Sequence, residues 1–212
     1  EILENLKKAV IEYDPEKAAS WAKKAVEEDV DPIEALDVLT AAIRQVGDGY
    51  ENGELWLPDL TGAAEAMKAA MPILEEELIS RGAEREVLGT VAIGTVKGDI
   101  HNIGKSMVIA LLTAENFRVH DVGVDVTAEE FIEAIREYEP DILGMSALMT
   151  MTAAQQKRVI ETLKAEGLRD RVKIMVGGGA ITEGFAESIG ADGYDPSAVG
   201  AVQVAKRLVG KE

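Results

Sequence analysis

The chain has 212 residues, enough for two small domains or one large one, and its apolar content of 47% includes few aromatic residues, 4% of the chain. It contains no cysteine, which excludes disulfides, thiolate nucleophiles and zinc or iron–sulfur sites built on cysteine. The net charge of −17 disfavours nucleic acid and anionic membrane surfaces as partners, because no basic surface is available to displace counterions.

No apolar run approaches the roughly 20 residues that span a bilayer, and the sequence shows no secretory leader. Together with the missing cysteines, this favours a cytoplasmic protein. Because the first residue is Glu1, we expect that a few N-terminal residues have been removed.

Residues 1–84 are predicted to form an all-helical domain. Three short breaks divide it, at Asp14-Pro15, Asp31-Pro32 and Asn52-Gly53. In the first two, an aspartate that can cap a helix precedes a proline suited to the first helical turn. The fourth helix is expected to begin near Pro58 and to run to Arg81-Gly82. Four helices with short connections predict a four-helix bundle.

Residues 85–212 follow a different rhythm, in which short apolar runs alternate with helical stretches. The runs predict buried strands at 87–93, 117–122, 142–145 and 172–176. The helical stretches lie at 104–115, 128–138, 153–166, 183–189 and 196–209. This alternation predicts an α/β domain with a doubly wound, Rossmann- or flavodoxin-like parallel sheet. Residues 82–86 are the best candidate for the linker between the two domains.

Three unusual segments follow three of the predicted strands, at 94–104, 146–152 and 177–179. In a doubly wound sheet they converge on the edge where ligands bind. The first contains His101, one of two histidines in the chain, with Asp99 two positions before it. A histidine beside a carboxylate can be a metal ligand, a general base or half of a surface pair, and these residues alone leave all three open. A structural or solvated role is expected for His120.

The spacing of these segments resembles a known signature. Asp99-x-His101-x-x-Gly104 is followed after 41 residues by Ser146-x-Leu148, and after 28 more by Gly177-Gly178. This pattern is similar to the cobalamin-binding domain of cobalamin-dependent methionine synthase. The segment from Gly53 to Met67, with Leu-Trp-Leu-Pro at its centre, resembles the helical cap that precedes that domain. The resemblance covers nearly the whole chain, whose size is similar to that of the free-standing corrinoid proteins of methyltransferase systems.

The resemblance implies a role for each matching residue. His101 would displace the cofactor's own base and bind cobalt (base-off, His-on), while Asp99 would hydrogen-bond the other ring nitrogen. Thr152 takes the place of a hydroxyl residue, usually serine, that completes this relay, and Trp56 would cover the cobalt. The implied cofactor-binding set is Val96, Gly98, Asp99, Ile100, His101, Asn102, Ile103, Gly104, Ser146, Leu148, Thr150, Thr152, Gly177, Gly178 and Tyr194.

The function implied by the resemblance is that of a methyl carrier, itself a non-catalytic subunit. Cobalt(I) of a bound cobalamin or related corrinoid would accept a methyl group through a substrate-specific methyltransferase. A second methyltransferase would pass the group to tetrahydrofolate or a thiol. A separate reductive activator is expected, because the chain has no cysteine. The helical domain is expected to move aside for each partner about residues 82–86.

Other readings fit the sequence less well. A mutase subunit that uses adenosylcobalamin would need a barrel for which there is no room, and a cobalamin-dependent repressor would need a basic helix-turn-helix. A signalling receiver would need an aspartate where the third predicted strand ends in Met145-Ser146. The main alternative is a regulatory or storage protein that binds cobalamin without transferring methyl groups.

Overall fold

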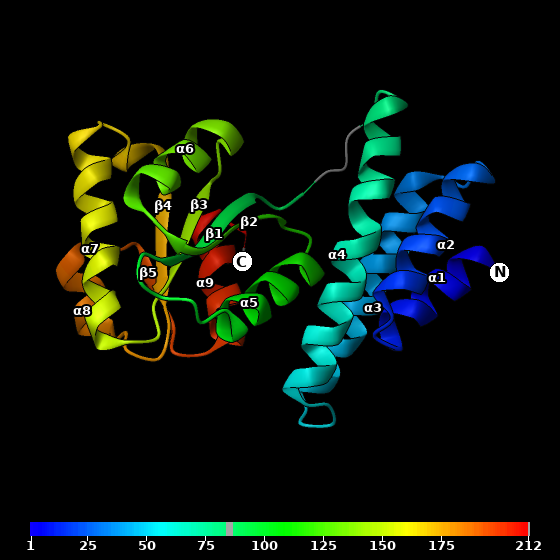
Figure 1. Ribbon diagram of the computed structural model, residues 1–212, viewed down its shortest axis with the longest axis horizontal. Helices are drawn as coiled ribbons and strands as arrows, with labels where there is room; N and C mark the ends of the chain where they lie inside the picture. Colours follow the sequence, from blue (N-terminus) through cyan, green and yellow to red (C-terminus); the bar gives the residue numbers. More distant parts are fainter. Residues whose placement is uncertain (84–86, 212) are drawn as a thin grey trace. The chain divides into compact units, whose positions relative to one another are not determined.

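Residues 1–83 and 87–211 are described by a computed structural model, in which the chain divides into a helical unit followed by a unit built on a parallel sheet (Figure 1). The predicted linker over 82–86 lies partly outside these residues, because 84–86 are not described. Within the described residues, no helix is both long and apolar enough to cross a membrane.

The first unit contains four helices, α1 (Ile2–Ile11), α2 (Pro15–Glu27), α3 (Pro32–Glu51) and α4 (Leu57–Ser80). The predicted caps are present, because Asp14 accepts a hydrogen bond from the backbone N–H of Lys17 and Asp31 accepts one from that of Ile33, both at 2.9 Å. Helix α4 packs against the other three. The core they enclose is built from Ala, Leu, Val, Ile and Met. The predicted four-helix bundle is therefore confirmed.

The second unit is a five-stranded parallel sheet flanked by helices. Its strands are β1 (Thr90–Val96), β2 (Arg118–Val126), β3 (Ile142–Ser146), β4 (Lys173–Gly177) and β5 (Gly193–Tyr194). Its helices are α5 (Ile103–Ala114), α6 (Ala128–Tyr138), α7 (Thr150–Ala165), α8 (Glu183–Ile189) and α9 (Ala198–Leu208), with a short 3-10 helix at Arg169–Arg171. The alternation confirms the predicted doubly wound fold.

The strand order explains where a ligand can bind. The order in the sheet is β2-β1-β3-β4-β5 and every pair is parallel. Helices α6, α7 and α8 cover one face, while α5 and α9 cover the other (Figure 1). The connection leaving β1 runs toward β2 and the connection leaving β3 runs toward β4, so the winding reverses between β1 and β3. Ligands of such sheets bind beyond the carboxyl ends of the strands at this reversal.

The structure differs from the prediction at β1, at β2, which continues four residues further than expected to Val126, and at β5. Strand β1 begins and ends three residues later than expected, because its pairing continues through Gly94 to Val96. Gly94 stays in the strand since the missing side chain leaves room for the buried ring of Phe131. Strand β5 has only two residues and no apolar run, so it left no periodic pattern in the sequence.

Gly94→Ala should destabilise the sheet unit. A Cβ atom at this position would lie 2.8 Å from Cε1 of the fully buried Phe131. We expect a loss of about 1–3 kcal/mol in the free energy of unfolding, the usual cost of overpacking a core. Urea unfolding of the full chain measures it, with hydrogen exchange of the β1 amides identifying the transition of this unit.

Gly184→Ala is the matched control, because a Cβ there meets nothing within 4 Å and Ala favours helix more than Gly. It should leave stability unchanged or slightly raised. Equal stability of Gly94→Ala and the unmodified protein would contradict the packing argument.

Candidate functional site

The loop after β1 begins with a tight turn that aims the Asp99 side chain inward. The backbone N–H of Asp99 donates to the carbonyl of Val96 at 3.1 Å, and Gly98 has φ of +80°. A positive φ at this place in a turn favours glycine, since a side chain would be strained there. The conformation of Gly98 therefore fixes where the following carboxylate points.

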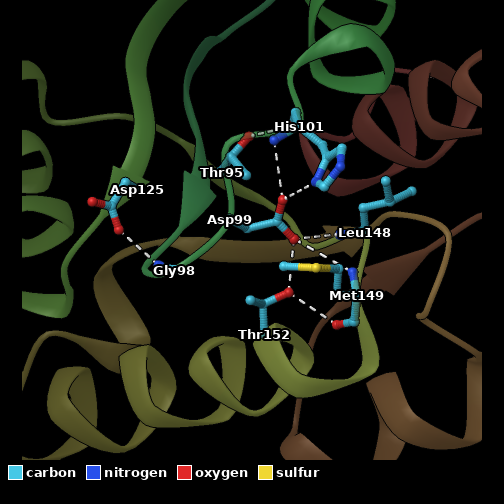
Figure 2. Close-up of polar contacts among 8 residues, drawn as sticks. All are labelled: Thr95, Gly98, Asp99, His101, Asp125, Leu148, Met149 and Thr152. Carbon is cyan, nitrogen blue, oxygen red and sulfur yellow. Dashed lines mark hydrogen bonds and ion pairs between the residues drawn. The ribbon is translucent and has the colours of Figure 1, made fainter.

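The carboxylate of Asp99 is fully buried and accepts hydrogen bonds from five donors (Figure 2). Its Oδ1 receives the backbone N–H of His101 at 3.0 Å and faces Nδ1 of the same residue at 2.7 Å. Its Oδ2 receives the Thr152 hydroxyl at 2.7 Å and the backbone N–H of Leu148 at 2.8 Å, with that of Met149 at 3.4 Å. The side chain thus joins the loops after β1 and β3 at the reversal of the sheet.

These contacts control the protonation of Asp99. Burial alone would raise the pKa of the carboxyl, but the hydrogen bonds from Thr152, His101 and Leu148 outweigh it and hold the pKa well below its ordinary value. The side chain is therefore ionised at neutral pH. A buried anion of this kind is tolerated only because nearly all of its lone pairs are satisfied.

His101 is oriented by this anion and is itself half exposed. With Nδ1 beside the carboxylate, the neutral ring places its hydrogen on Nδ1 and keeps the lone pair on Nε2. Within the described residues, Nε2 has no hydrogen bond to the protein. A second contact fixes the backbone, because the buried hydroxyl of Thr95 donates to the carbonyl of His101 at 3.0 Å. The arrangement presents one basic nitrogen to an incoming metal or proton.

The site has room for the methyl group of Thr152, which a serine at this position would lack. Its Cγ2 lies 3.7 Å from the position that a Cβ atom on Gly98 would occupy, which is an ordinary van der Waals distance, so the methyl group meets no clash at this turn. The hydroxyl also lies 2.9 Å from the carbonyl oxygen of Met149, and its single hydrogen can point to either acceptor. The hydroxyl predicted to complete the relay is therefore within reach of Asp99.

Beside this network lies a cavity of about 200 Å³, between the sheet and the first turns of α5 and α9. Its walls are mostly apolar side chains from β1, β3 and β4. Gly104 and Gly177 line it, and a Cβ atom at either position would enter open space. Gly178 lines it as well, and there a Cβ atom would lie 2.1 Å from the carbonyl oxygen of Ala147. At Gly104 and Gly177 the missing side chain keeps the cavity open, whereas at Gly178 it lets the backbone pack closely against Ala147.

The predicted site residues separate into three groups. The network of Asp99, His101 and Thr152 lies together with the cavity residues Gly104, Ser146, Gly177 and Gly178. Ile100, Asn102, Ile103, Leu148 and Thr150 are exposed around the network, with Val96 and Gly98 in the turn below it. Tyr194 stands apart: like the exposed Thr150 it does not line the cavity, and its hydroxyl donates to the carbonyl of Ile181 at 2.8 Å.

Trp56 is the N-cap residue directly before α4 in the helical unit, where its backbone N–H donates to the side chain of Asp59 at 2.7 Å. Its side chain is 75% exposed, so Trp56 does not fill the core of the helical bundle. An indole this exposed is available to cover a ligand.

Sequence reasoning missed three residues that support the site. Asp125 has a left-handed φ of +56° after an irregular stretch of β2, and it accepts the backbone N–H of Gly98 at 2.7 Å. Gln156 is fully buried and donates to the carbonyls of Met145 and Gly177, which ties the ends of β3 and β4 together. Lys105 is buried at the cavity and paired with Asp121.

Only one of these three left a usable sign in the sequence. Gln156 lies four residues after Thr152, hence on the same helical face. The position of Asp125 depends on an irregular strand, which no periodic pattern reveals.

Comparison with known proteins gives consistent matches over the whole chain. Residues 89–203 match a family model described as a B12 binding domain, and residues 2–75 match a second model of the same description. Trimethylamine corrinoid protein 2 of Methanosarcina acetivorans is 44% identical over 210 residues, which cover 99% of this chain and 97% of that protein. A corrinoid protein of Desulfitobacterium hafniense is 42% identical over 212 residues, covering 99% and 98%.

Solved structures give the same result. A chain of the methanol:cobalamin methyltransferase complex MtaBC from Methanosarcina barkeri matches with a TM-score of 0.81 and 31% identity, over 98% of this chain and 79% of that one. A cobalamin-binding protein from Desulfitobacterium hafniense matches with a TM-score of 0.64 and 28% identity, over 98% of both chains.

Thr152→Val should lower the free energy of unfolding at neutral pH and make it depend less on pH under acid conditions. The pKa of folded Asp99 is below its ordinary value of 3.8, so its network stabilises the fold above about pH 5, and this stabilisation is lost as the pH falls below about 4. Removing the hydroxyl should cost about 1–3 kcal/mol at pH 7 and raise the pKa of Asp99. Urea unfolding of the protein without cofactor, at about pH 7, 5 and 3, measures both effects.

Thr152→Ser is the control, since it keeps the hydroxyl and should retain the steeper pH dependence. The network would be refuted if the valine and serine variants lost stability in parallel at every pH.

Proposed function

This chain belongs to the family of corrinoid proteins built from B12-binding domains, and from this we propose that it carries methyl groups between two methyltransferases on the cobalt of a bound corrinoid. The observation that carries the proposal is the half-exposed imidazole of His101, oriented by the buried anion of Asp99 beside an open, glycine-lined cavity.

The residues present fit a corrinoid with a displaced tail. Gly104 and Gly177 form a cradle that any larger residue would fill, which supports the entry of a bulky group between the sheet and α5 and α9. Large apolar side chains are exposed around His101, as a flat apolar ligand requires: Ile100, Ile103, Leu148, Met149 and Met151.

Each part of the site then has a task. His101 would bind cobalt through Nε2, since imidazole suits first-row transition metals. Ser146 would contact the tail inside the cavity, and Gly104, Gly177 and Gly178 would let it approach the backbone. When bound, the cobalt supplies the chemistry, accepting a methyl group in its cobalt(I) state and passing it on.

The network below the imidazole is suited to hold a proton. When His101 is not bound to metal, Nε2 can take up a proton, and the resulting cation lies beside the ionised carboxylate of Asp99. Thr152 keeps a hydrogen bond on the other carboxylate oxygen, which holds Asp99 ionised in either state. These residues would therefore couple release of the ligand to uptake of a proton.

Trp56 is proposed as the cover for the opposite face of the corrin. Its exposed indole is anchored at the start of α4 by a fixed backbone, and an apolar cover would keep water away from a reactive methyl group.

The partners follow from the proposed role. A substrate-specific methyltransferase would load the carrier, a second one would unload it to tetrahydrofolate or a thiol, and a separate reductive activator would restore cobalt(I). Relatives are named for trimethylamine and dimethylamine, which makes a methylated amine the first methyl source to test. Failure of the loaded protein to give up its methyl group to any methyltransferase would favour the alternative, a regulatory or storage protein.

His101→Ala should remove the protein ligand without preventing folding, because the ring is half exposed. The unmodified protein should bind cobalamin base-off, and the spin resonance of its cobalt(II) form should show splitting from one nitrogen. The variant should lose that splitting. His120→Ala is the control and should keep the splitting. The His120 ring lies away from the network and stacks on the ring of Tyr138, with 4.1 Å between the ring centroids. A protein that binds no base-off cobalamin would overturn the proposal.

Trp56→Ala should expose the bound methyl group. We expect faster photolysis of the methylcobalamin-loaded protein and faster loss of the methyl group to an added thiol, both followed by absorbance. Trp21→Ala removes the other tryptophan, which lies under Lys24 on α2, and should change neither rate. If both variants match the unmodified protein, Trp56 is not the cover.

A further inference from the structure

One carboxylate on the cavity wall plays no part in the network described above. Asp195 follows β5 and lines the cavity together with Ser197, at the start of α9. The other charged residue on the wall, Lys105, is already paired with Asp121. Most of the remaining wall is apolar, including Ile93, Val108, Met145, Met175, Val176, Ala198 and Ala201.

The position of Asp195 is fixed by its neighbours. Its Oδ1 accepts both the backbone N–H and the hydroxyl of Ser197 at 2.8 Å, while the Ser197 oxygen caps α9 by accepting the N–H of Gly200 at 2.9 Å. A Cβ atom on Gly200 would lie 2.0 Å from Cγ of Asp195, so the carboxylate occupies the space that a side chain there would fill. The first turn of the helix holds the group in place.

The second oxygen of this carboxylate can still accept a hydrogen bond. Within the described residues, Oδ2 of Asp195 accepts no hydrogen bond. An acceptor on the wall of a mainly apolar cavity favours a ligand that brings a donor, because the lone pairs of a carboxylate are costly to leave unmet.

The size of the cavity limits which ligand can carry such a hydrogen-bond donor into it. A cavity of about 150 Å³ holds one benzene ring, so about 200 Å³ suits a small planar ring system. Under the proposed function, this ring system is the lower base of the corrinoid's displaced tail. Lower bases differ at the edge of the ring, where dimethylbenzimidazole carries two methyl groups and no donor, and others carry an amino or a hydroxyl group.

We propose that Asp195 selects a corrinoid whose lower base presents a hydrogen-bond donor, an amino or a hydroxyl group, to the cavity wall. This inference rests on the proposed function, since it assumes that the tail enters the cavity. It assigns Asp195 a role in choosing the cofactor and none in methyl transfer. Cobalamin itself would bind, but less tightly than a corrinoid whose base carries the donor.

The test is equilibrium binding of the full chain to corrinoids that differ only in the lower base. The bases are adenine, hydroxybenzimidazole, its methoxy analogue and dimethylbenzimidazole, with a corrinoid lacking the tail as reference. We expect hydroxybenzimidazole to bind at least about tenfold more tightly than the methoxy analogue, the ratio for one hydrogen bond to a charged acceptor. The adenine arm shows whether an amino group serves as well as a hydroxyl.

Asp195→Ala should bring this ratio close to one while dimethylbenzimidazole binding stays the same or tightens. Comparing the ratio between proteins cancels the different tendencies of the free corrinoids to bind their own base. Ser197→Ala is the matched control, because it disturbs the same cap but keeps the carboxylate, and it should preserve the preference. Asp195→Asn is the second variant if alanine prevents folding, and it should reduce the ratio.

The possible results distinguish a failure of the inference about Asp195 from a failure of the proposed function. Equal binding of the hydroxy and methoxy corrinoids by the unmodified protein overturns the selection by Asp195 and leaves the proposed function standing. An unchanged ratio in both Asp195 variants does the same. Failure to bind any of the corrinoids, including the one without a tail, counts against the proposed function itself.

Discussion

A buried negative charge organises the functional end of the sheet unit. Asp99 has no exposed surface, and an uncompensated carboxylate in that position would cost several kcal/mol. The compensation comes from the loop after β1, the loop after β3 and the first turn of α7, which must all approach the same two oxygens. Because those segments are far apart in sequence, the charge forces the reversal point of the sheet to close around it. The orientation of His101 follows from that closure.

The fold could be predicted from sequence because its helices and strands rest on local patterns, whereas the network was expected only because the motifs resemble those of a known family. Aspartate–proline pairs mark helix starts by a cap that acts within three residues, and buried strands of a parallel sheet appear as apolar runs. The resemblance to cobalamin-binding domains implied the set of Asp99, His101 and Thr152, and the structure brings the three side chains within hydrogen-bond distance. The residues alone had left a metal ligand, a general base and a surface pair open for His101.

What the sequence did not reveal depends on contacts without a local pattern. Asp125 reaches Gly98 only because β2 slips in register twice against β1, and a slip changes which face each later residue occupies. Asp195 lines the cavity because a strand of two residues brings it there, and Gly200 leaves room for it. Tyr194, which the resemblance implied as part of the cofactor-binding set, donates its hydroxyl to the carbonyl of Ile181, a contact that no sequence pattern reveals. Such details are set by three-dimensional packing.

The way His101 is held has a further consequence, for the speed with which the protein can be loaded. Every contact that orients the imidazole comes from the protein itself: the carboxylate of Asp99, the hydroxyl of Thr95 and the turn at Gly98. The imidazole is thus preorganised before any cofactor arrives. The entropy of fixing the ring is lost when the chain folds, and the affinity for each new cofactor is not reduced by it. Under the proposed function, the slow event in loading would then be the departure of the corrinoid's own base from the metal, a step that belongs to the cofactor and not to the fold.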